Sequence, residues 1–236
     1  SDEFLSSNAN GGIINAAEGS SLVLGQQALL RNSTTIKDGG AVYLNGGARM
    51  QMMFDSEIRN CSAEGNGGAV YVESGASLET AGSPVIRDCS ANGNGGAVYV
   101  ANSGVVSLGT TTDVWPTIAN NKSGGDGAGI YLFGADSRLY LKGSIKFEDN
   151  YNDKEISETN GGEEYTKPRQ DVYLQYDSSG DAKNICVTGE IALGSDFDSI
   201  WVWAYNRDHY LVDKQFAVIQ DGINVTDKTL RVFRNA

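Results

Sequence analysis

Short runs of alternating apolar and polar residues recur along this chain, separated by clusters of Gly, Asn, Asp and Ser. In one unit these runs cover Ala69–Glu73, Ala76–Thr80 and Pro84–Asp88. Alternation with a period of two is the pattern of β-strands, whereas the period of about 3.6 residues of an amphipathic helix is missing from the units. The chain is therefore predicted to be all-β, with three short strands in each unit.

The units repeat at a nearly constant spacing. The sequence Gly-Gly-Ala-Val-Tyr begins at Gly39, Gly67 and Gly95, and looser copies begin at Gly11 and Gly127. The residues at the tyrosine position lie 28, 28, 28 and 32 residues apart, and they are Asn15, Tyr43, Tyr71, Tyr99 and Tyr131. A degenerate sixth copy, Asp171–Leu174, places Tyr173 a further 42 residues along.

Two more positions keep the same phase, and together they predict the architecture. An aliphatic column comprises Leu30, Ile58, Ile86 and Ile118, and a polar column comprises Asn32, Asn60, Asp88 and Asn120. A period that holds at several phases indicates a solenoid in which like residues stack. Three short strands and three turns make one rung of a right-handed parallel β-helix, whose rungs stack at about 4.8 Å. Leucine-rich repeats are the main rival, but their Leu-x-x-Leu-x-Leu pattern is missing. We expect about six rungs.

The alternation also assigns the two faces of each strand. Val70 and Val72 should point into the core, so the tyrosine between them should point outward. An outward strip of aromatic faces about 4.8 Å apart could stack on sugar rings or bind a protein, although it could equally stabilise the sheet alone. The candidate ligand-binding residues are Tyr43, Tyr71, Tyr99, Tyr131 and Tyr173. The polar column is expected to form a side-chain ladder at a corner.

These repeats resemble a known type. Gly-Gly-Ala-Val at Gly39, Gly67 and Gly95 and Phe-x-x-Asn at Phe147–Asn150 are similar to the paired motifs of the polymorphic outer-membrane protein repeat of bacterial surface adhesins. Looser copies of the second motif carry Ile in place of Phe, and they are Ile58–Cys61, Ile86–Cys89 and Ile118–Asn121. The resemblance covers roughly residues 11–150. It implies an extracellular, adhesin-like β-helix without catalytic residues.

The chain is predicted to have three parts. Residues 1–150 carry the β-helix repeats, and residues 151–168 form an acidic inserted loop, in which paired carboxylates could hold a cation but are more often simply solvated. Residues 169–236 contain the last rung and a C-terminal β cap, in which Ile200–Trp203 and Leu211–Val218 are expected to form short antiparallel strands. A cap would cover strand edges that otherwise invite aggregation.

The formal net charge of −12 argues against nucleic acid and anionic lipid as partners, since both need a cationic surface. No apolar run is long enough for a membrane-spanning helix. We therefore expect no nucleic-acid binding and no membrane insertion of this segment.

Few residues suggest chemistry. The single histidine, His209, is expected to be a surface or packed residue, and we predict no catalytic residue, no metal site and no cofactor. Cys61 and Cys89 lie one repeat apart and should stack as reduced thiols, because parallel Cβ vectors fit a disulfide poorly, while Cys186 is left unpaired. An outward arginine column precedes the polar column, and it comprises Arg31, Arg59 and Arg87. Its repetition indicates a structural role, since an active site is normally unique.

These features predict an adhesin-like binding module of a bacterial surface protein, displayed outside the cell. It would recognise a host or microbial protein or glycan through a long β-helix face, without catalysis. Two alternatives stay open at this point. One is a carbohydrate-active β-helix enzyme, either a polysaccharide lyase or a glycoside hydrolase, and the other is a passive structural stalk.

Overall fold

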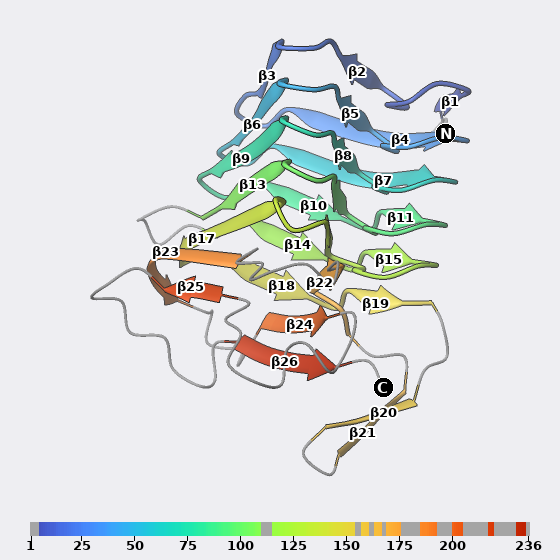
Figure 1. Ribbon diagram of the computed structural model, residues 1–236. Coiled ribbons are helices and arrows are strands. Elements are labelled where there is room, and N and C mark those ends of the chain that lie inside the picture. Colours follow the sequence, from blue (N-terminus) through green and yellow to red (C-terminus); the bar gives the residue numbers. More distant parts are fainter. Residues whose placement is uncertain are drawn as a thin grey trace.

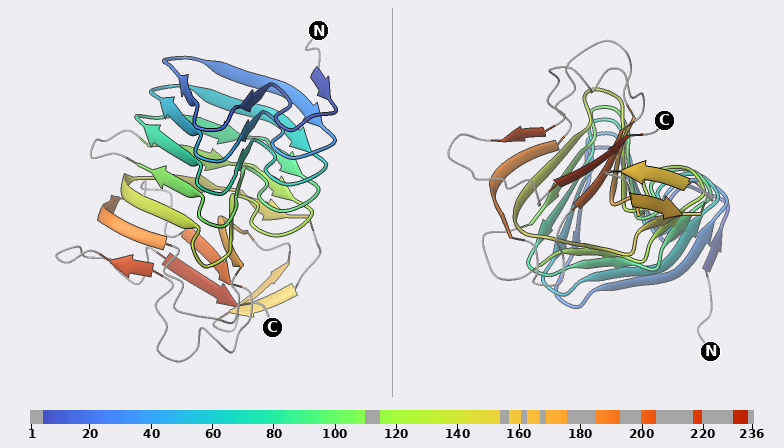
Figure 2. Two further views of the ribbon diagram at one scale, coloured as in Figure 1. Left: turned by 45° about the horizontal axis from the view of Figure 1, so that its top comes forward. Right: turned by 90° about the horizontal axis from the view of Figure 1, so that it is seen from below.

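A computed structural model describes residues 5–109, 115–153, 157–160, 163–166, 169–175, 185–192, 200–204, 217–219 and 230–234. These residues contain strands and no helix, and the strands stack in parallel as a β-solenoid (Figure 1). The predicted all-β, parallel β-helix is therefore confirmed. Seen along its length, the solenoid has turns that superpose on one another (Figure 2).

Each rung contributes in turn to three parallel sheets, which we call sheets B, C and A in chain order. Sheet B contains β2 (Ile14–Ala16), β5 (Val42–Leu44), β8 (Val70–Val72), β12 (Val98–Val100), β16 (Ile130–Phe133), β22 (Val172–Gln175), β24 (Ile200–Ala204) and β26 (Leu230–Arg234). Sheet C contains β3 (Ser21–Leu24), β6 (Arg49–Met53), β9 (Ser77–Ala81), β13 (Val105–Leu108), β17 (Arg138–Ser144), β23 (Ile185–Ala192) and β25 (Ala217–Ile219).

Sheet A differs because its strands bend within each rung. Its members are β1 (Leu5–Ser7), β4 (Leu29–Thr35), β7 (Glu57–Ala63), β10 (Val85–Arg87), β11 (Ser90–Ala91), β14 (Thr117–Ala119), β15 (Lys122–Ser123), β18 (Lys146–Glu148) and β19 (Tyr151–Asn152). The long strand β7 pairs with both β10 and β11, so the third rung replaces one long strand by two short ones. Five successive rungs supply strands to all three sheets.

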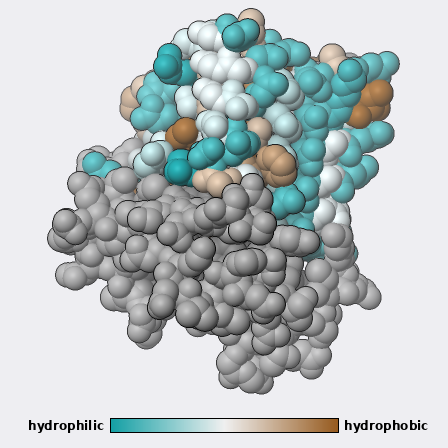
Figure 3. Space-filling model, viewed as in Figure 1, coloured by the Kyte–Doolittle hydropathy of each residue, from teal (hydrophilic) through white to brown (hydrophobic). Residues whose placement is uncertain are grey.

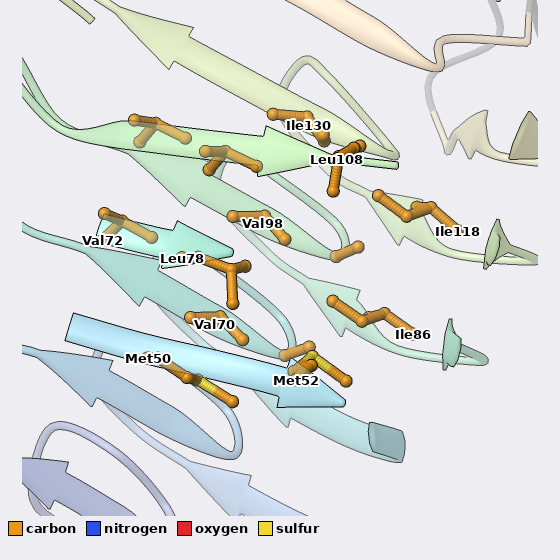
Figure 4. Packing of buried hydrophobic residues seen from close by; sticks show 14 of the residues in the cluster. Met50, Met52, Val70, Val72, Leu78, Ile86, Val98, Leu108, Ile118 and Ile130 are labelled. Carbon is orange, nitrogen blue, oxygen red and sulfur yellow. The ribbon is translucent and has the colours of Figure 1, made fainter. Parts of the chain in front are cut away.

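The core is built from the inward residues of the three sheets. In one rung Val70, Leu78 and Ile86 are 0 %, 0 % and 3 % exposed, and they lie over their counterparts in the neighbouring rungs (Figure 4). Fully burying one aliphatic side chain contributes roughly 1.5–3 kcal/mol, so the stacked columns supply the main driving force for folding. The regular alternation of the sequence places such residues on the inner side of all three sheets.

The polar column marks the bend within sheet A. Its members have left-handed backbone with φ between 49° and 55°, and they are Asn32, Asn60, Asp88, Asn120 and Asp149. Asn and Asp tolerate this conformation better than other side chains do. The predicted ladder of side-chain hydrogen bonds is present between Asn60 and Asn32, at 3.4 Å. The shared property of the column is its backbone conformation.

A second polar column, which we call the interior ladder, lies one residue further along and inside the solenoid. Its members are at most 1 % exposed, and they are Ser33, Cys61, Cys89, Asn121 and Asn150. Asn121 Oδ1 accepts a hydrogen bond from the Cys89 backbone N–H at 3.0 Å, and Asn150 Oδ1 accepts one from the Asn121 N–H at 3.2 Å. The ladder therefore satisfies backbone groups that the bend leaves unpaired.

The interior ladder ends at an ion pair whose carboxylate is buried. Asn150 Nδ2 donates to Asp171 Oδ1 at 3.1 Å, and the Asp171 carboxylate pairs with the Arg169 guanidinium at 2.9 Å. Arg169 also donates to the Phe147 carbonyl at 2.5 Å. Side chains from the returning chain thus cover the last strands of sheet A.

The inserted segment between the fifth and sixth copies contains an antiparallel hairpin, β20 (Ser157–Asn160) with β21 (Glu163–Thr166). It lies outside the three sheets (Figure 1). The acidic side chains of this hairpin lie outside the described residues, so the alternatives of a solvated loop and a bound cation stay untested. Beyond the insertion, β22 returns to sheet B in register with β16, as the degenerate sixth copy predicted.

The expectation of antiparallel strands at the C-terminal end is wrong. β24 and β26 extend sheet B in parallel, with Val172 opposite Val202 and Val202 opposite Val232, and β25 extends sheet C in parallel. The apolar alternation of Ile200–Ala204 matches that of β22, which explains why this segment continues the sheet even though the Gly-Gly motif has gone. Of the predicted strand Leu211–Val218, only its last two residues lie among the described residues, in β25 (Ala217–Ile219).

Candidate binding faces

The five predicted tyrosines lie together on the side of sheet B that faces away from the aliphatic core. They form a cluster separate from that core, and their Cα atoms are in register from β5 through β22. Neighbouring rings are stacked, with centroids 4.8–5.3 Å apart and interplanar angles of 5–14°. The predicted stacking at the spacing of one rung is therefore confirmed.

The expected exposure of this tyrosine ladder is wrong. Tyr43 and Tyr99 are each 8 % exposed, and Tyr131 and Tyr173 are 3 % and 1 % exposed. Only Tyr71 is half-buried. Because each ring covers the face of the next, the ladder cannot offer a row of open faces to sugar rings. Its evident contribution is to the sheet, since cross-strand aromatic pairs stabilise by about 0.2–1 kcal/mol each.

The tyrosine hydroxyls sit in a partly acidic environment. Burial, together with the Glu73 carboxylate, raises the pKa of Tyr43 well above its ordinary value. Burial, with the carboxylates of Asp38 and Glu73, raises the pKa of Tyr71 to about 12. Tyr131 donates a hydrogen bond to Gln175 Oε1. At neutral pH the ladder is uncharged, so it holds hydrogen-bonding groups without ionic ones. The ligand-binding role of these five tyrosines stays a prediction.

The two cysteines of the interior ladder are free and buried, as predicted. Each thiol donates to the carbonyl two residues earlier, Cys61 Sγ to Arg59 O and Cys89 Sγ to Arg87 O, both at 3.2 Å. Interaction with the neighbouring Cys89 side chain lowers the pKa of Cys61, whereas burial raises the pKa of Cys89. The thiols thus serve as small polar members of the ladder. The side chains of Cys186 and His209 lie outside the described residues.

A more open surface lies on the outside of sheet A, which we call the A face. Three columns in register run along it through five rungs. They are Leu29–Glu57–Val85–Thr117–Lys146, Arg31–Arg59–Arg87–Ala119–Glu148 and Thr34–Ser62–Ser90–Lys122–Tyr151. All of these residues except Ala119 are half-buried or exposed. The A face is therefore an extended, mainly polar surface with a repeat of one rung.

The charges of the A face are unevenly paired. Arg87 contacts Glu57 Oε1 through Nε at 2.6 Å and Asp88 Oδ2 through Nη1 at 2.5 Å. Arg59 approaches Glu57 Oε2 only at 3.8 Å, through a buried Nε that has no hydrogen-bond partner. Both carboxylates are thus engaged mainly by Arg87, and the charge of Arg59 is poorly compensated. Sequence analysis assigned this arginine column a structural role and missed the imbalance, which depends on side-chain geometry.

Hydroxyl groups lie beside the arginines. Thr34 Oγ1 and Ser62 Oγ are 3.0 Å apart, and Ser90 continues their column on the next rung. Sequence analysis did not single out these residues, although they recur one repeat apart and that spacing could have revealed them. Guanidinium and hydroxyl groups bind ligands by hydrogen bonding. Among the described residues, no group of three or more His, Cys, Asp or Glu side chains could hold a metal ion.

The described part of the face seen in Figure 3 is mostly hydrophilic or neutral, with a few separate apolar residues. In the described part of the chain there is no helix with the length and apolarity to span a membrane. No protein-family model, curated protein or solved structure matches the chain. The resemblance to the polymorphic outer-membrane protein repeat therefore rests on the motifs alone.

Proposed function

We propose that this chain is an adhesin-like binding module of a bacterial surface protein, working outside the cell. Its A face would recognise an extended host or microbial surface ligand, without catalysis. The observation that supports the proposal is the A face itself, where hydrogen-bonding side chains stay accessible and in register through successive rungs. In the tyrosine ladder, by contrast, the ring faces contact one another. A surface with a regular repeat suits a polymer that can make the same contact several times, because linked weak contacts add avidity.

The proposal is tested by blocking the A face with a bulky side chain. Ser62→Trp places an indole in the hydroxyl column, and Ser77→Trp, on the outer side of sheet C, is the matched control. The wild-type chain and both variants would be screened on arrays of host glycans, bacterial glycans and extracellular matrix proteins. Ser62→Trp should abolish the signal of the ligands that the wild-type chain captures, and Ser77→Trp should preserve it. Equal binding by both variants would remove the A face from the proposal.

A further inference from the structure

We propose that Arg59, flanked by Arg31 and Arg87, binds the acidic group of a polysaccharide that lies along the A face. The inference rests on the proposed function and names the ligand class. It comes from the only partly compensated guanidinium of Arg59 and from its place in the middle of the arginine column. Arg31 lies opposite Arg59 on one side, and Arg87 lies opposite it on the other.

Like charges stacked on neighbouring strands repel one another. On the described A face the carboxylates of Glu57 and Asp88 offset this repulsion, but both contact Arg87, at 2.5–2.6 Å. Arg59 has a single 3.8 Å approach to Glu57, and its side chain is 28 % exposed. An anion that binds at Arg59 therefore gains two things. It meets a guanidinium that makes no hydrogen bond within the described residues, and it relieves the repulsion within the column.

The chemistry of guanidinium selects the anion. Its planar fork pairs with two oxygens of a carboxylate or sulfate group at once, which makes charge-assisted hydrogen bonds of higher strength than neutral ones. In a chain with a net charge of −12, an acidic ligand is repelled at long range and must be held by short-range contacts. The binding should therefore depend on this particular arginine more than on the total charge.

The surroundings of Arg59 favour a sugar over a peptide. A peptide strand commonly binds a sheet by adding to a free edge, but β7 is paired with β4 on one side and with β10 and β11 on the other. What the A face offers is side chains. The hydroxyls of Thr34, Ser62 and Ser90 lie across the bend from the arginines and suit the hydroxyl groups of a sugar ring.

Binding of polygalacturonate, dextran sulfate, neutral dextran and polyglutamate to the whole chain, measured by titration calorimetry, tests the inference. Arg59→Gln should weaken the binding of the acidic polysaccharides about tenfold, the loss expected for one charge-assisted contact. Arg49→Gln is the matched control, since Arg49 is an exposed arginine on sheet C and its loss changes the net charge equally. This control should change the affinity by less than about twofold. Glu57→Gln, which removes a competing carboxylate, should strengthen binding. Polygalacturonate and dextran sulfate distinguish carboxylate from sulfate as the preferred group.

Four outcomes would overturn the inference. Equal losses in Arg59→Gln and Arg49→Gln would show that only total charge matters. Neutral dextran bound as tightly as the acidic polymers would exclude an anionic contact, and tighter binding of polyglutamate would indicate a peptide. If Ser62→Trp abolishes binding while Arg59→Gln leaves it unchanged, the A face is retained as the binding surface, but recognition of an acidic group by Arg59 is rejected. Urea midpoints of the variants would verify that each is folded.

Discussion

The side-chain amide of Asn121 supplies a hydrogen-bond partner to the backbone of the neighbouring rung: its Oδ1 accepts a hydrogen bond from the Cys89 N–H at 3.0 Å. The same side chain donates from Nδ2 to the Ile86 carbonyl at 3.2 Å. One amide thus satisfies two backbone groups on either side of Asp88, where the left-handed residue interrupts the pairing of sheet A. The bend is possible without buried, unpaired groups because of this side chain.

Replacing this amide should destabilise the fold. Asn121→Ala leaves the Cys89 N–H and the Ile86 carbonyl without partners, and an unsatisfied buried group costs roughly 1–3 kcal/mol. The free energy of unfolding in urea should fall by about 3 kcal/mol. Lys122→Ala, at the exposed neighbouring position, should change it by less than about 0.5 kcal/mol. A loss no greater in Asn121→Ala than in this control would contradict the role of the ladder.

The second glycine of the repeated Gly-Gly pair is required by the close approach of neighbouring rungs. A Cβ on Gly68 would lie 2.5 Å from the Ser90 carbonyl carbon and closer still to the Gly96 carbonyl oxygen. Gly68→Ala must therefore displace backbone in two rungs, and we expect a loss of at least about 3 kcal/mol in urea unfolding. At Gly25 a Cβ would meet no atom within 4 Å, so Gly25→Ala should be neutral. A tolerated Gly68→Ala would mean that the rungs are less closely packed than described here.

The tyrosine ladder should make stability depend on pH in the alkaline range. In the unfolded chain tyrosines ionise near pH 10, whereas burial and nearby carboxylates raise the pKa of folded Tyr71 to about 12. Between these values the unfolded state holds fewer protons than the folded state, so the free energy of unfolding falls as pH rises. Urea midpoints measured from pH 8 to 12 should be constant at first and then decline from about pH 10.

Phenylalanine variants separate this effect from general alkaline denaturation. Tyr71→Phe keeps the stacked ring but cannot ionise, so its urea midpoint should decline less steeply than that of the wild-type chain. Tyr151→Phe is the comparison at a more exposed position outside the ladder. Burial and Asp149 also raise the pKa of Tyr151, but this residue is 39 % exposed, so this variant should lessen the decline by a smaller amount than Tyr71→Phe does. Identical alkaline slopes for the wild-type chain and Tyr71→Phe would exclude a contribution from Tyr71.

Much of the architecture could be predicted from the sequence, because a β-solenoid uses the same side chains in every rung. The columns that contain Tyr71 and Ile86 recur every 28 to 32 residues over the first five copies and indeed stack in register. The sequence predicts that Cys61 and Cys89 stack but does not predict the whole interior ladder, because its chemistry changes along the chain from these thiols to the amide of Asn121. The last position of the Phe-x-x-Asn motif marks this column and could have revealed it.

The features that failed to follow from the sequence depend on contacts between elements. Alternation indicated which side of the strand Tyr99 occupies, but its 8 % exposure depends on neighbouring rings and segments that no local pattern describes. The imbalance between Arg59 and Arg87 depends likewise on the direction in which Glu57 points. The prediction of antiparallel strands beyond Ile200 was wrong because the stack continues without the Gly-Gly motif, through the alternation of Val202 with its neighbours.

The insertion before β22 shows how such a chain can diversify. Ile130 and Val172 are direct neighbours in sheet B although 42 residues separate them, against 28 between Val42 and Val70. Extra residues leave the stack at a corner and return without shifting its register. Corners of this protein are therefore natural graft points, at which new loops can be exchanged by recombination or design while the scaffold beneath them remains intact.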